Sequence, residues 1–147
     1  MTGEIILRPA QPPDLTFCEQ VYFREMGWII KALKLDPARH RDGFTRQWQC
    51  AEVRIITLGN DEVGWLQTTA ADDTIFLGQL YLDGRFQRQG IGSCAMRLLI
   101  EEAASTQKAV ALTVVKINPA RRFYERLGFR VTHEDQHKLY MRRDPLS

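Results

Sequence analysis

The amino-acid sequence predicts an α/β (α+β) fold, in which a mixed central sheet carries helices on both faces within a single domain, residues 1–147. Three observations support this prediction. The middle of the chain alternates β-branched segments with turn residues, as an antiparallel meander does. Strand–helix–strand units follow later in the chain and favour some parallel pairing. A length of 147 residues is close to the common size of one domain.

The N-terminal third predicts one strand and two helices. Ile5–Arg8 is a short apolar strand, and a helix opens near Asp14, where apolar residues return at helical spacing. The second helix begins with Asp36 as N-cap and Pro37 at the first helical position. We expect this helix to run to about Cys50.

The meander itself comprises three strands and two turns. Val53–Leu58 is β-branched, Gly59–Asp61 is a turn, and Val63–Thr69 is the returning strand. A second turn at Asp72-Asp73 leads into the long strand Thr74–Leu82.

The C-terminal half follows a loop at Asp83–Gln89. Its predicted elements are a helix at Ile91–Thr106, a buried strand at Ala109–Val115, a short helix from the N-cap Asn118 to the C-cap glycine Gly128, and strands at Phe129–Glu134 and Lys138–Arg142. The predicted order is therefore β-α-α-β-β-β-α-β-α-β-β.

Composition excludes several classes of protein. A hydrophobic fraction of 44% and a charged fraction of 26% are ordinary globular values, which excludes a disordered or fibrous chain. The formal net charge is +2, from 20 basic and 18 acidic residues, so no strong field favours nucleic acid or a membrane surface as a partner.

The cysteines indicate whether the chain holds a metal site, and the N-terminus indicates in which compartment the protein is found. Cys18, Cys50 and Cys94 match neither a disulfide framework nor a zinc ligand set, so we expect no metal and a reducing compartment. The N-terminus lacks the basic start and long apolar core of a signal peptide. No apolar run approaches the ~18 residues of a membrane span. We therefore expect a soluble, cytoplasmic protein.

The most informative segment runs from Leu80 to Gly92, where a strand feeds a glycine-bearing loop and then a helix. The first N–H groups of a helix have no partners within the helix, and the helix dipole adds partial positive charge there. Gly90 and Gly92 let the backbone approach a ligand closely. Together these features predict a cradle for a pyrophosphate, with Arg85 and Arg88 at its rim.

Two alternatives apply to the same segment. The glycines also suit an ordinary helix start. In addition, Gly90–Ala95 fits the dinucleotide fingerprint G-x-G-x-x-A. Against the fingerprint, seven residues separate Leu82 from Gly90, and the next strand ends at Lys116 rather than at an acidic residue for a ribose.

Two motifs relate the chain to a known superfamily. Gln87–Gly92 resembles the acetyl-CoA motif Q/R-x-x-G-x-G/A of the GNAT acyltransferases. Asn118–Phe129 resembles, in loose form, the second signature N-x-x-A-x-x-F-Y-x-x-x-G-F. The two motifs lie a helix and a strand apart, as the superfamily requires. The chain therefore resembles a GNAT N-acetyltransferase of the small bacterial-type subgroup of unassigned substrate, most clearly from Thr74 to about Met141.

This resemblance implies acetyl-CoA as the co-substrate, held between the strands Thr74–Leu82 and Ala109–Val115. Backbone groups of Leu80 and Leu82 would hold the pantetheine arm. Asn118 would touch that arm, although its role as N-cap is sufficient to explain it. The residues implied for the pyrophosphate are Gln87, Arg88, Gln89, Gly90, Ile91, Gly92 and Ser93.

The resemblance also implies direct attack of an amine on the thioester. Tyr124 matches the motif tyrosine that acts as general acid on the thiolate, and its alternative role is to pack in the core. A backbone N–H near Leu80 would stabilise the oxyanion. Many GNAT enzymes carry a glutamate at the positions of Gly78 or Gln79, and neither residue titrates usefully. The remaining candidates for the base are Glu19, Glu25, Asp72, His133 and His137, or bulk water.

The sequence does not identify the acyl acceptor. Tyr22, Glu25 and Gln79 are the residues that we expect near it, because the first two helices cover the acceptor site in the superfamily. Aromatic and sulfur side chains that suit either an acceptor pocket or the core are Tyr22, Met26, Trp28, Trp48 and Trp65. We expect a small-molecule or protein amine as partner, and a homodimer is compatible with the superfamily. The alternative function is a CoA-binding sensor or partner module without catalysis.

Overall fold

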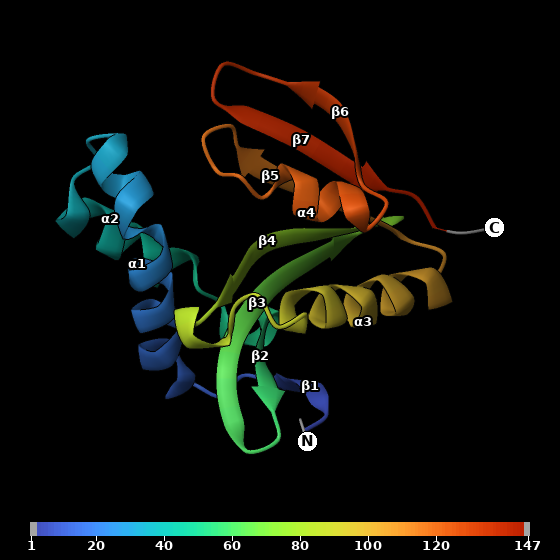
Figure 1. Ribbon diagram of the computed structural model, residues 1–147, viewed down its shortest axis with the longest axis horizontal. Helices are drawn as coiled ribbons and strands as arrows, with labels where there is room; N and C mark the ends of the chain where they lie inside the picture. Colours follow the sequence, from blue (N-terminus) through green and yellow to red (C-terminus); the bar gives the residue numbers. More distant parts are fainter. Residues whose placement is uncertain (1–2, 146–147) are drawn as a thin grey trace. The chain divides into compact units, whose positions relative to one another are not determined.

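The computed structural model describes residues 3–145, and its elements follow the predicted order (Figure 1). They are β1 (Ile5–Pro9), α1 (Asp14–Ala32), α2 (Pro37–Gln47), β2 (Val53–Leu58), β3 (Asp61–Ala71), β4 (Thr74–Leu82), α3 (Ile91–Ser105), β5 (Ala109–Val115), α4 (Arg121–Arg126), β6 (Arg130–Glu134) and β7 (Lys138–Arg143). Short 3-10 turns lie at Cys50–Glu52 and Gly84–Phe86. The extent of the predicted domain, 1–147, stays a prediction, and its first two and last two positions lie outside the described residues.

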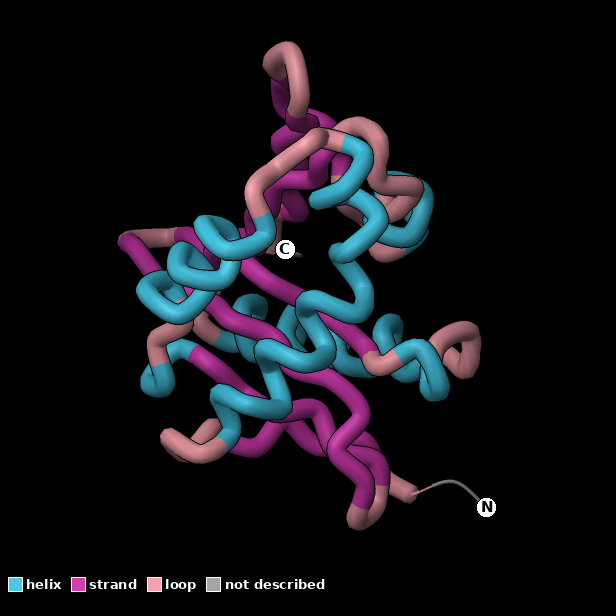
Figure 2. The backbone as a smooth tube through the Cα atoms, turned by 90° about the vertical axis from the view of Figure 1, so that its left-hand side faces the viewer, coloured by secondary structure: helices cyan, strands magenta, loops and turns pink. Residues whose placement is uncertain are grey.

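The strands form a seven-stranded mixed sheet in the order β1-β2-β3-β4-β5-β7-β6, which confirms the predicted α+β class. β4 pairs with β5 in parallel, from Thr74–Leu77 against Ala109–Leu112. The pairs β1–β2, β2–β3, β5–β7 and β6–β7 are antiparallel. Figure 2 traces the strands in magenta and the helices in cyan.

The chain divides into two compact units, which are described in turn. Among the described residues, unit 1 comprises 3–67 and 79–92, and unit 2 comprises 68–78 and 93–145. The strands β3 and β4 therefore each contribute residues to both units.

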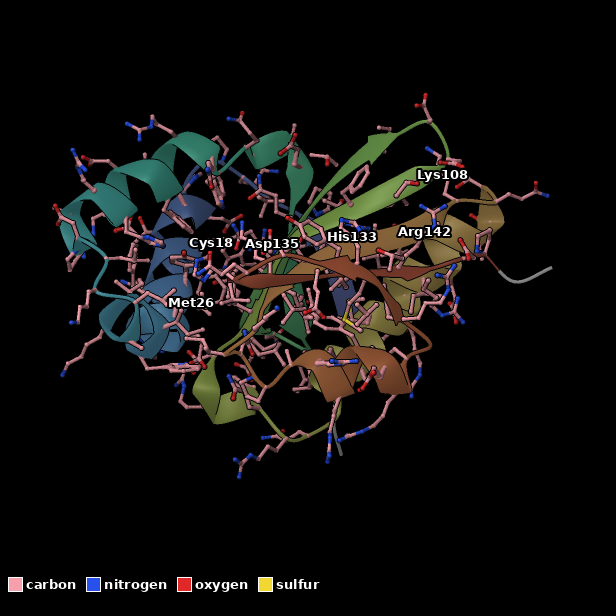
Figure 3. The ribbon with its side chains drawn as sticks, turned by 90° about the horizontal axis from the view of Figure 1, so that it is seen from above. Cys18, Met26, Lys108, His133, Asp135 and Arg142 are labelled. Atoms are coloured by element: carbon pink, nitrogen blue, oxygen red, sulfur yellow. The ribbon has the colours of Figure 1, made fainter. Side chains whose placement is uncertain are left out.

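An aromatic cluster forms the centre of unit 1. The Tyr22 ring of α1 lies 4.8 Å from the Phe44 ring of α2 and 5.1 Å from the Tyr81 ring of β4. Trp65 of β3 is fully buried and lies within 5.8 Å of the rings of both Phe44 and Tyr81. Edge-on and tilted ring pairs of this kind add about 0.5–1.5 kcal/mol each beyond the area that they bury. Cys18 and Met26, labelled on α1 in Figure 3, belong to the same core.

Both ends of α2 have identifiable caps. The Asp36 side chain accepts a hydrogen bond from the Ala38 N–H at 3.0 Å, as predicted for an N-cap. The predicted end near Cys50 is wrong, because α2 ends at Gln47 and Trp48 already has an extended backbone. The Gln67 side chain donates to the Gln47 carbonyl at 2.9 Å, which satisfies one of the carbonyls that a helix end leaves unpaired.

Gly64 of β3 allows β4 to approach closely. A Cβ atom at this position would lie 2.3 Å from the Tyr81 carbonyl oxygen and 3.0 Å from the Leu82 Cα. No side chain fits there, so glycine is required for the backbone of β4 to reach this position.

In unit 2, β5 is bordered by β4 on one side and by β7 on the other. β6 and β7 form a hairpin in which the Asp135 carboxylate accepts hydrogen bonds from the N–H groups of His137 and Lys138, at 2.9 and 2.7 Å. Figure 3 labels His133 and Asp135 on this hairpin, together with Arg142 of β7, whose guanidinium donates to the Thr74 hydroxyl at 3.2 Å.

The short helix α4 departs from prediction at its start and agrees at its end. Asn118 is not its N-cap, because α4 begins at Arg121 and the Asn118 side chain instead accepts from the Ala120 N–H at 3.0 Å. The asparagine thus forms a local turn before the helix, a common use of its short side chain. Gly128 ends the helix with a φ of +92°, as predicted for a C-cap glycine.

An ionic network ties the start of α1 to the sheet of unit 1. Arg8 of β1 donates to both carboxylate oxygens of Asp14, at 2.9 and 3.1 Å, and also pairs with Glu62 of β3. The Asp14 carboxylate also accepts from the Gln11 N–H at 2.7 Å. The Arg8 hydrogen bond is the main cause that lowers the pKa of Asp14, outweighing the opposite effect of burial.

The first prediction concerns acid stability. Because the folded-state pKa of Asp14 is depressed, its stabilising contribution is present above the ordinary aspartate pKa of ~3.9 and disappears as pH falls through the folded value. Asp14→Asn should lower the free energy of unfolding by about 1–3 kcal/mol at pH 7, and by much less at pH 2.5. Urea denaturation at both pH values measures the difference.

The exposed Asp42 of α2 supplies the control. Asp42→Asn should change the free energy of unfolding by less than about 0.5 kcal/mol at either pH. An effect of Asp14→Asn that is equal at pH 7 and pH 2.5 would show that the network does not stabilise the fold.

Candidate active site

A buried carboxylate anchors the loop that follows β4. The Asp83 N–H donates to the Val63 carbonyl at 2.8 Å, which keeps the loop start beside β3. The Asp83 side chain is buried and accepts from the Arg85 N–H at 3.1 Å and from the Arg24 guanidinium of α1 at 2.8 Å. One side chain therefore holds the strand end, the 3-10 turn and α1 together.

The charge of Asp83 is stabilised despite its burial. Burial by itself raises the pKa of this carboxyl, but hydrogen bonds from the Arg85 N–H and guanidinium, with the positive charges of Arg85 and Arg24, lower it overall. The sequence analysis missed Asp83. An Asp-Gly pair directly after a strand is the signal that could have found it, because aspartate accepts hydrogen bonds from the turn that follows.

Two glutamines of the loop stabilise it through side-chain hydrogen bonds. The Gln87 amide nitrogen donates to the Glu25 carboxylate of α1 at 2.6 Å and to the Leu82 carbonyl at 3.0 Å. Gln89 donates to the Arg85 carbonyl at 3.2 Å. The side chains of these two predicted cofactor residues are thus used within the protein. Glu25, predicted near the acceptor, instead lies beside the loop.

The backbone of the loop takes an unusual path just before α3. Arg88 has a φ of +63° and Gly90 has a φ of +80°, so two residues of the predicted motif lie in the left-handed region. A non-glycine residue there costs on the order of 1–2 kcal/mol, and such strain is concentrated at functional sites. A Cβ on Gly90 would meet no atom within 4 Å, so this position faces open space.

The loop then opens into the 15-residue helix α3, whose first residues are Ile91, Gly92 and Ser93. Their N–H groups lie at the positive end of a helix, and Arg85 and Arg88 are both exposed on the loop. These features have the chemistry of an anion site.

Unit 1 also contains a pocket of about 200 Å³. Its lining residues come from α1, α2, the segment after α2, β3 and β4: Tyr22, Arg39, His40, Gly43, Phe44, Gln47, Trp48, Gln67 and Gln79. Of the residues predicted near the acceptor, Tyr22 and Gln79 therefore lie on this pocket. The Tyr22 hydroxyl and the His40 Nε2 are 2.5 Å apart and share a hydrogen bond.

His40 was missed by the sequence analysis, because one histidine on a polar helix carries no distinguishing pattern. None of the five predicted candidates for the base lines the pocket. Glu19 pairs with Arg41 at 3.6 Å, and Glu25 lies at the loop. Of the aromatic and sulfur candidates, Tyr22 and Trp48 line the pocket. Trp65 and Met26 pack in the core, and Trp28 is half exposed.

Gln67 has a defined orientation in the pocket wall. Its amide nitrogen donates to the Gln47 carbonyl and to the Glu52 carboxylate, both at 2.9 Å. Both partners are pure acceptors, so the nitrogen and oxygen of this amide are assigned without ambiguity. Both N–H groups are used, and the amide oxygen is the atom that remains for a ligand.

Tyr124 lies in unit 2, in α4. Its ring is 5.7 Å from that of Phe129, and its carbonyl accepts from the Phe129 N–H at 3.1 Å. The Gly128 N–H donates to the Glu125 carbonyl at 3.0 Å, which completes a Schellman cap with its apolar contact. Burial raises the pKa of Tyr124 to about 12, so the phenol keeps its proton at neutral pH.

Comparison with known families identifies the class of protein. Residues 17–129 match the sequence model of the Acetyltransferase (GNAT) family. The chain belongs to this family. The expectation of an acyltransferase enzyme with the GNAT fold is thereby confirmed. No curated protein matches the sequence significantly.

Solved structures show the same fold at low sequence identity. The PaiA N-acetyltransferase of Thermoplasma acidophilum, solved in complex with coenzyme A, is 14% identical with a TM-score of 0.80, over 96% of this chain and 99% of its own. An acetyltransferase from Thermus thermophilus is 20% identical with a TM-score of 0.76, over 95% and 96% of the two chains. The ribosomal-protein-S18-alanine N-acetyltransferase of Escherichia coli is 18% identical with a TM-score of 0.69, over 100% and 96%.

The part of the chain that the structure describes lacks two further features. No helix within residues 3–145 is long and apolar enough to cross a membrane. Over the same residues, no group of three or more histidine, cysteine or acidic side chains is arranged to hold a metal ion.

The second prediction concerns the loop anchor. Asp83→Ala removes the acceptor of the Arg85 N–H and the partner of the Arg24 guanidinium. Amide hydrogen exchange at Arg85 should accelerate by about tenfold or more, since one hydrogen bond contributes about 1–1.5 kcal/mol. Mass spectrometry or NMR of the exchange measures this change.

The exposed Asp61 at the start of β3 provides a matched variant. Asp61→Ala should leave exchange at Arg85 unchanged. Equal exchange rates in Asp83→Ala and the unmodified protein would mean that the loop is held by other contacts.

Proposed function

We propose that the protein is an acetyl-CoA-dependent N-acetyltransferase that transfers the acetyl group directly to an amine bound in the 200 Å³ pocket. One observation within unit 1 carries the proposal. Gln79 of β4 lines the pocket, Leu80 is the next residue, and the cofactor loop begins at the end of the same strand. The strand β4 therefore contributes a residue to the proposed acceptor pocket and leads directly into the proposed cofactor loop.

The residues proposed to hold acetyl-CoA act mainly through their backbone. The N–H groups of the loop and of the start of α3 would bind the pyrophosphate, at Gln87, Arg88, Gln89, Gly90, Ile91, Gly92 and Ser93. Leu80 and Leu82 would bind the pantetheine arm. Both residues lie after Leu77, where the pairing of β4 with β5 ends. Their backbone groups are therefore not used in that pairing, which supports this role. Asn118 is proposed to touch the arm, although its side chain already accepts from Ala120.

The proposed reaction forms one C–N bond and breaks one C–S bond. The neutral amine attacks the thioester carbonyl, and an N–H near Leu80 stabilises the oxyanion. The departing thiolate then requires a proton or a hydrogen bond. Tyr124 is proposed to supply it, and a phenol of pKa about 12 suits a hydrogen bond better than full transfer to a thiol of ordinary pKa ~8.5.

The proton that the amine loses needs an acceptor. Gly78 and Gln79 offer none, so we assign this role to the His40–Tyr22 pair on the pocket wall, because a neutral imidazole has one ring nitrogen that accepts a proton. A cysteine intermediate is disfavoured for Cys18, whose pKa burial raises to about 12. Cytoplasmic location, preference for acetyl over longer acyl groups, and a homodimer stay predictions.

A second candidate function is a CoA-binding module without catalysis. The observation that favours it is the absence of a titrating side chain at Gly78 and Gln79 on the proposed catalytic strand. The two functions share a cofactor and differ in whether any amine releases free CoA thiol.

The third prediction tests the cofactor and its loop. Acetyl-CoA at 100 times its dissociation constant stabilises a protein by about 2.7 kcal/mol, which raises the melting temperature by a few degrees. We expect this shift with acetyl-CoA and with CoA, and none with NAD or NADP. Gly90→Glu should abolish the shift, because a carboxylate would repel the phosphates.

Gly90→Ala is the matched variant for backbone strain. It has the same unfavourable φ without the charge, so it should retain much of the shift. A shift with NAD or NADP alone would overturn the proposed cofactor. Equal shifts in Gly90→Glu and Gly90→Ala would remove the phosphate site from this loop.

The fourth prediction tests Tyr124. Tyr124→Phe keeps the ring contacts and the helix cap but removes the proton donor, so kcat should fall by roughly 10²–10⁴-fold while the Kd for acetyl-CoA is unchanged. Release of free CoA thiol measures kcat, and calorimetry measures the Kd.

Tyr140→Phe removes a phenol elsewhere in unit 2, where the hydroxyl donates to Asp135, and should retain full activity. Full activity of Tyr124→Phe would contradict the catalytic role. Failure of every amine to release thiol, together with tight binding of acetyl-CoA, would favour the non-catalytic module.

A further inference from the structure

We infer that the acceptor is a small amine that carries a carboxylate, that is, a free amino acid rather than a polyamine or a protein N-terminus. The inference deepens the proposed function and rests on it, because it concerns the same pocket of unit 1. Three properties of the pocket carry it: the sign of its charge, the polarity of its wall groups, and its size.

The charge of the pocket is positive. None of its nine lining residues is acidic, and Arg39 is an exposed cation that forms no ion pair with another residue of the described chain. Glu52 does not line the pocket, and its carboxylate accepts a hydrogen bond from the Gln67 amide. A diamine or polyamine would bring a second ammonium toward Arg39 with no carboxylate on the wall to receive it, which is unfavourable.

The position of Arg39 also suits an anion. It is the third residue of α2, an 11-residue helix, so it lies in the first turn, where the helix dipole adds positive potential. Arginine presents a planar fork that matches the two oxygens of a carboxylate.

The strand wall of the pocket suits the amine. The Gln67 oxygen is the free end of an amide whose N–H groups are already used by Gln47 and Glu52. Gln79 also lines the pocket, and its side chain makes no hydrogen bond with another described residue, so its amide oxygen is also available. An amide oxygen accepts an N–H of the amine but carries no charge, so it opposes the loss of the ammonium proton less than a carboxylate would.

The cation and the acceptor oxygens thus come from different walls. Arg39 belongs to α2, whereas Gln67 and Gln79 belong to β3 and β4. An amino acid that places its carboxylate toward α2 directs its amine toward the strand that carries Leu80.

The size and the remaining walls limit the rest of the acceptor. A volume of about 200 Å³ is below the ~300–1,000 Å³ of sites for drug-sized ligands. Tyr22, Phe44 and Trp48 offer aromatic surface for an apolar side chain. The first residue of a protein has no free carboxylate, so it would leave Arg39 without a partner.

The test uses matched acceptors that differ only in the carboxylate. The pairs are alanine with ethylamine, leucine with 3-methylbutylamine, and phenylalanine with 2-phenylethylamine. Leucinamide stands for a protein N-terminus, and 1,4-diaminobutane stands for polyamines. Calorimetric binding to the protein saturated with CoA, and thiol release with acetyl-CoA, are both measured. We expect at least one amino acid to exceed its decarboxylated partner by about tenfold or more in affinity and in kcat/KM.

Arg39→Gln should abolish that preference while binding of the decarboxylated amine stays unchanged. Arg46→Gln is the control, because Arg46 is an exposed arginine on the same helix that does not line the pocket. It should leave the preference intact. Both variants introduce glutamine, which is uncharged and has a helix propensity close to that of arginine, so α2 should fold in each.

Several outcomes would overturn the inference. They are equal or better binding of the decarboxylated amine in all three pairs, preference for leucinamide or the diamine, failure of all three acids to bind, and an unchanged preference in Arg39→Gln. Because binding is measured without turnover, such a result refutes the acceptor class alone. Loss of the acetyl-CoA thermal shift would instead refute the proposed function.

Discussion

The packing of one tyrosine determines how the helices of unit 1 meet its strands. The Tyr22 ring contacts Phe44 of α2 and Tyr81 of β4, and Trp65 completes the cluster from β3. The ring is buried, yet its hydroxyl reaches His40 on the pocket wall. A close-packed interior tolerates little change in volume, so the aromatic cluster fixes the distance between α2 and β4. Two members of the cluster, Tyr22 and Phe44, also line the pocket.

The loop after β4 is held by hydrogen bonds and not by apolar packing, since little apolar surface is buried there. Asp83, Gln87 and Gln89 use their side chains to hold the loop backbone, and residues 87–90 are exposed. A loop held in this way can present N–H groups to an anion without reorganising when the anion binds, which preserves binding free energy. Gly90 adopts its left-handed φ without steric cost, and Arg88 lies between Gln87 and Gln89, whose side chains hold the loop.

Local chemistry could be predicted from the sequence, and contacts between distant segments could not. Asp36 as N-cap and Gly128 as C-cap follow from neighbouring residues, and both are observed. Asn118 shows the limit of this reasoning, because a local asparagine turn and an N-cap have the same sequence signal. The Tyr22–His40 contact spans 18 residues, and that of Gln87 with Glu25 spans 62, so no local pattern marks either pair.

A single turn of α1 takes part in both the pocket and the loop. Tyr22 lines the pocket, whereas Arg24 and Glu25, two and three residues further along, hold Asp83 and Gln87. The backbone hydrogen bonds of a helix hold the residues of one turn in a fixed relative geometry. One turn of α1 therefore supports both a wall of the pocket and the contacts that hold the loop.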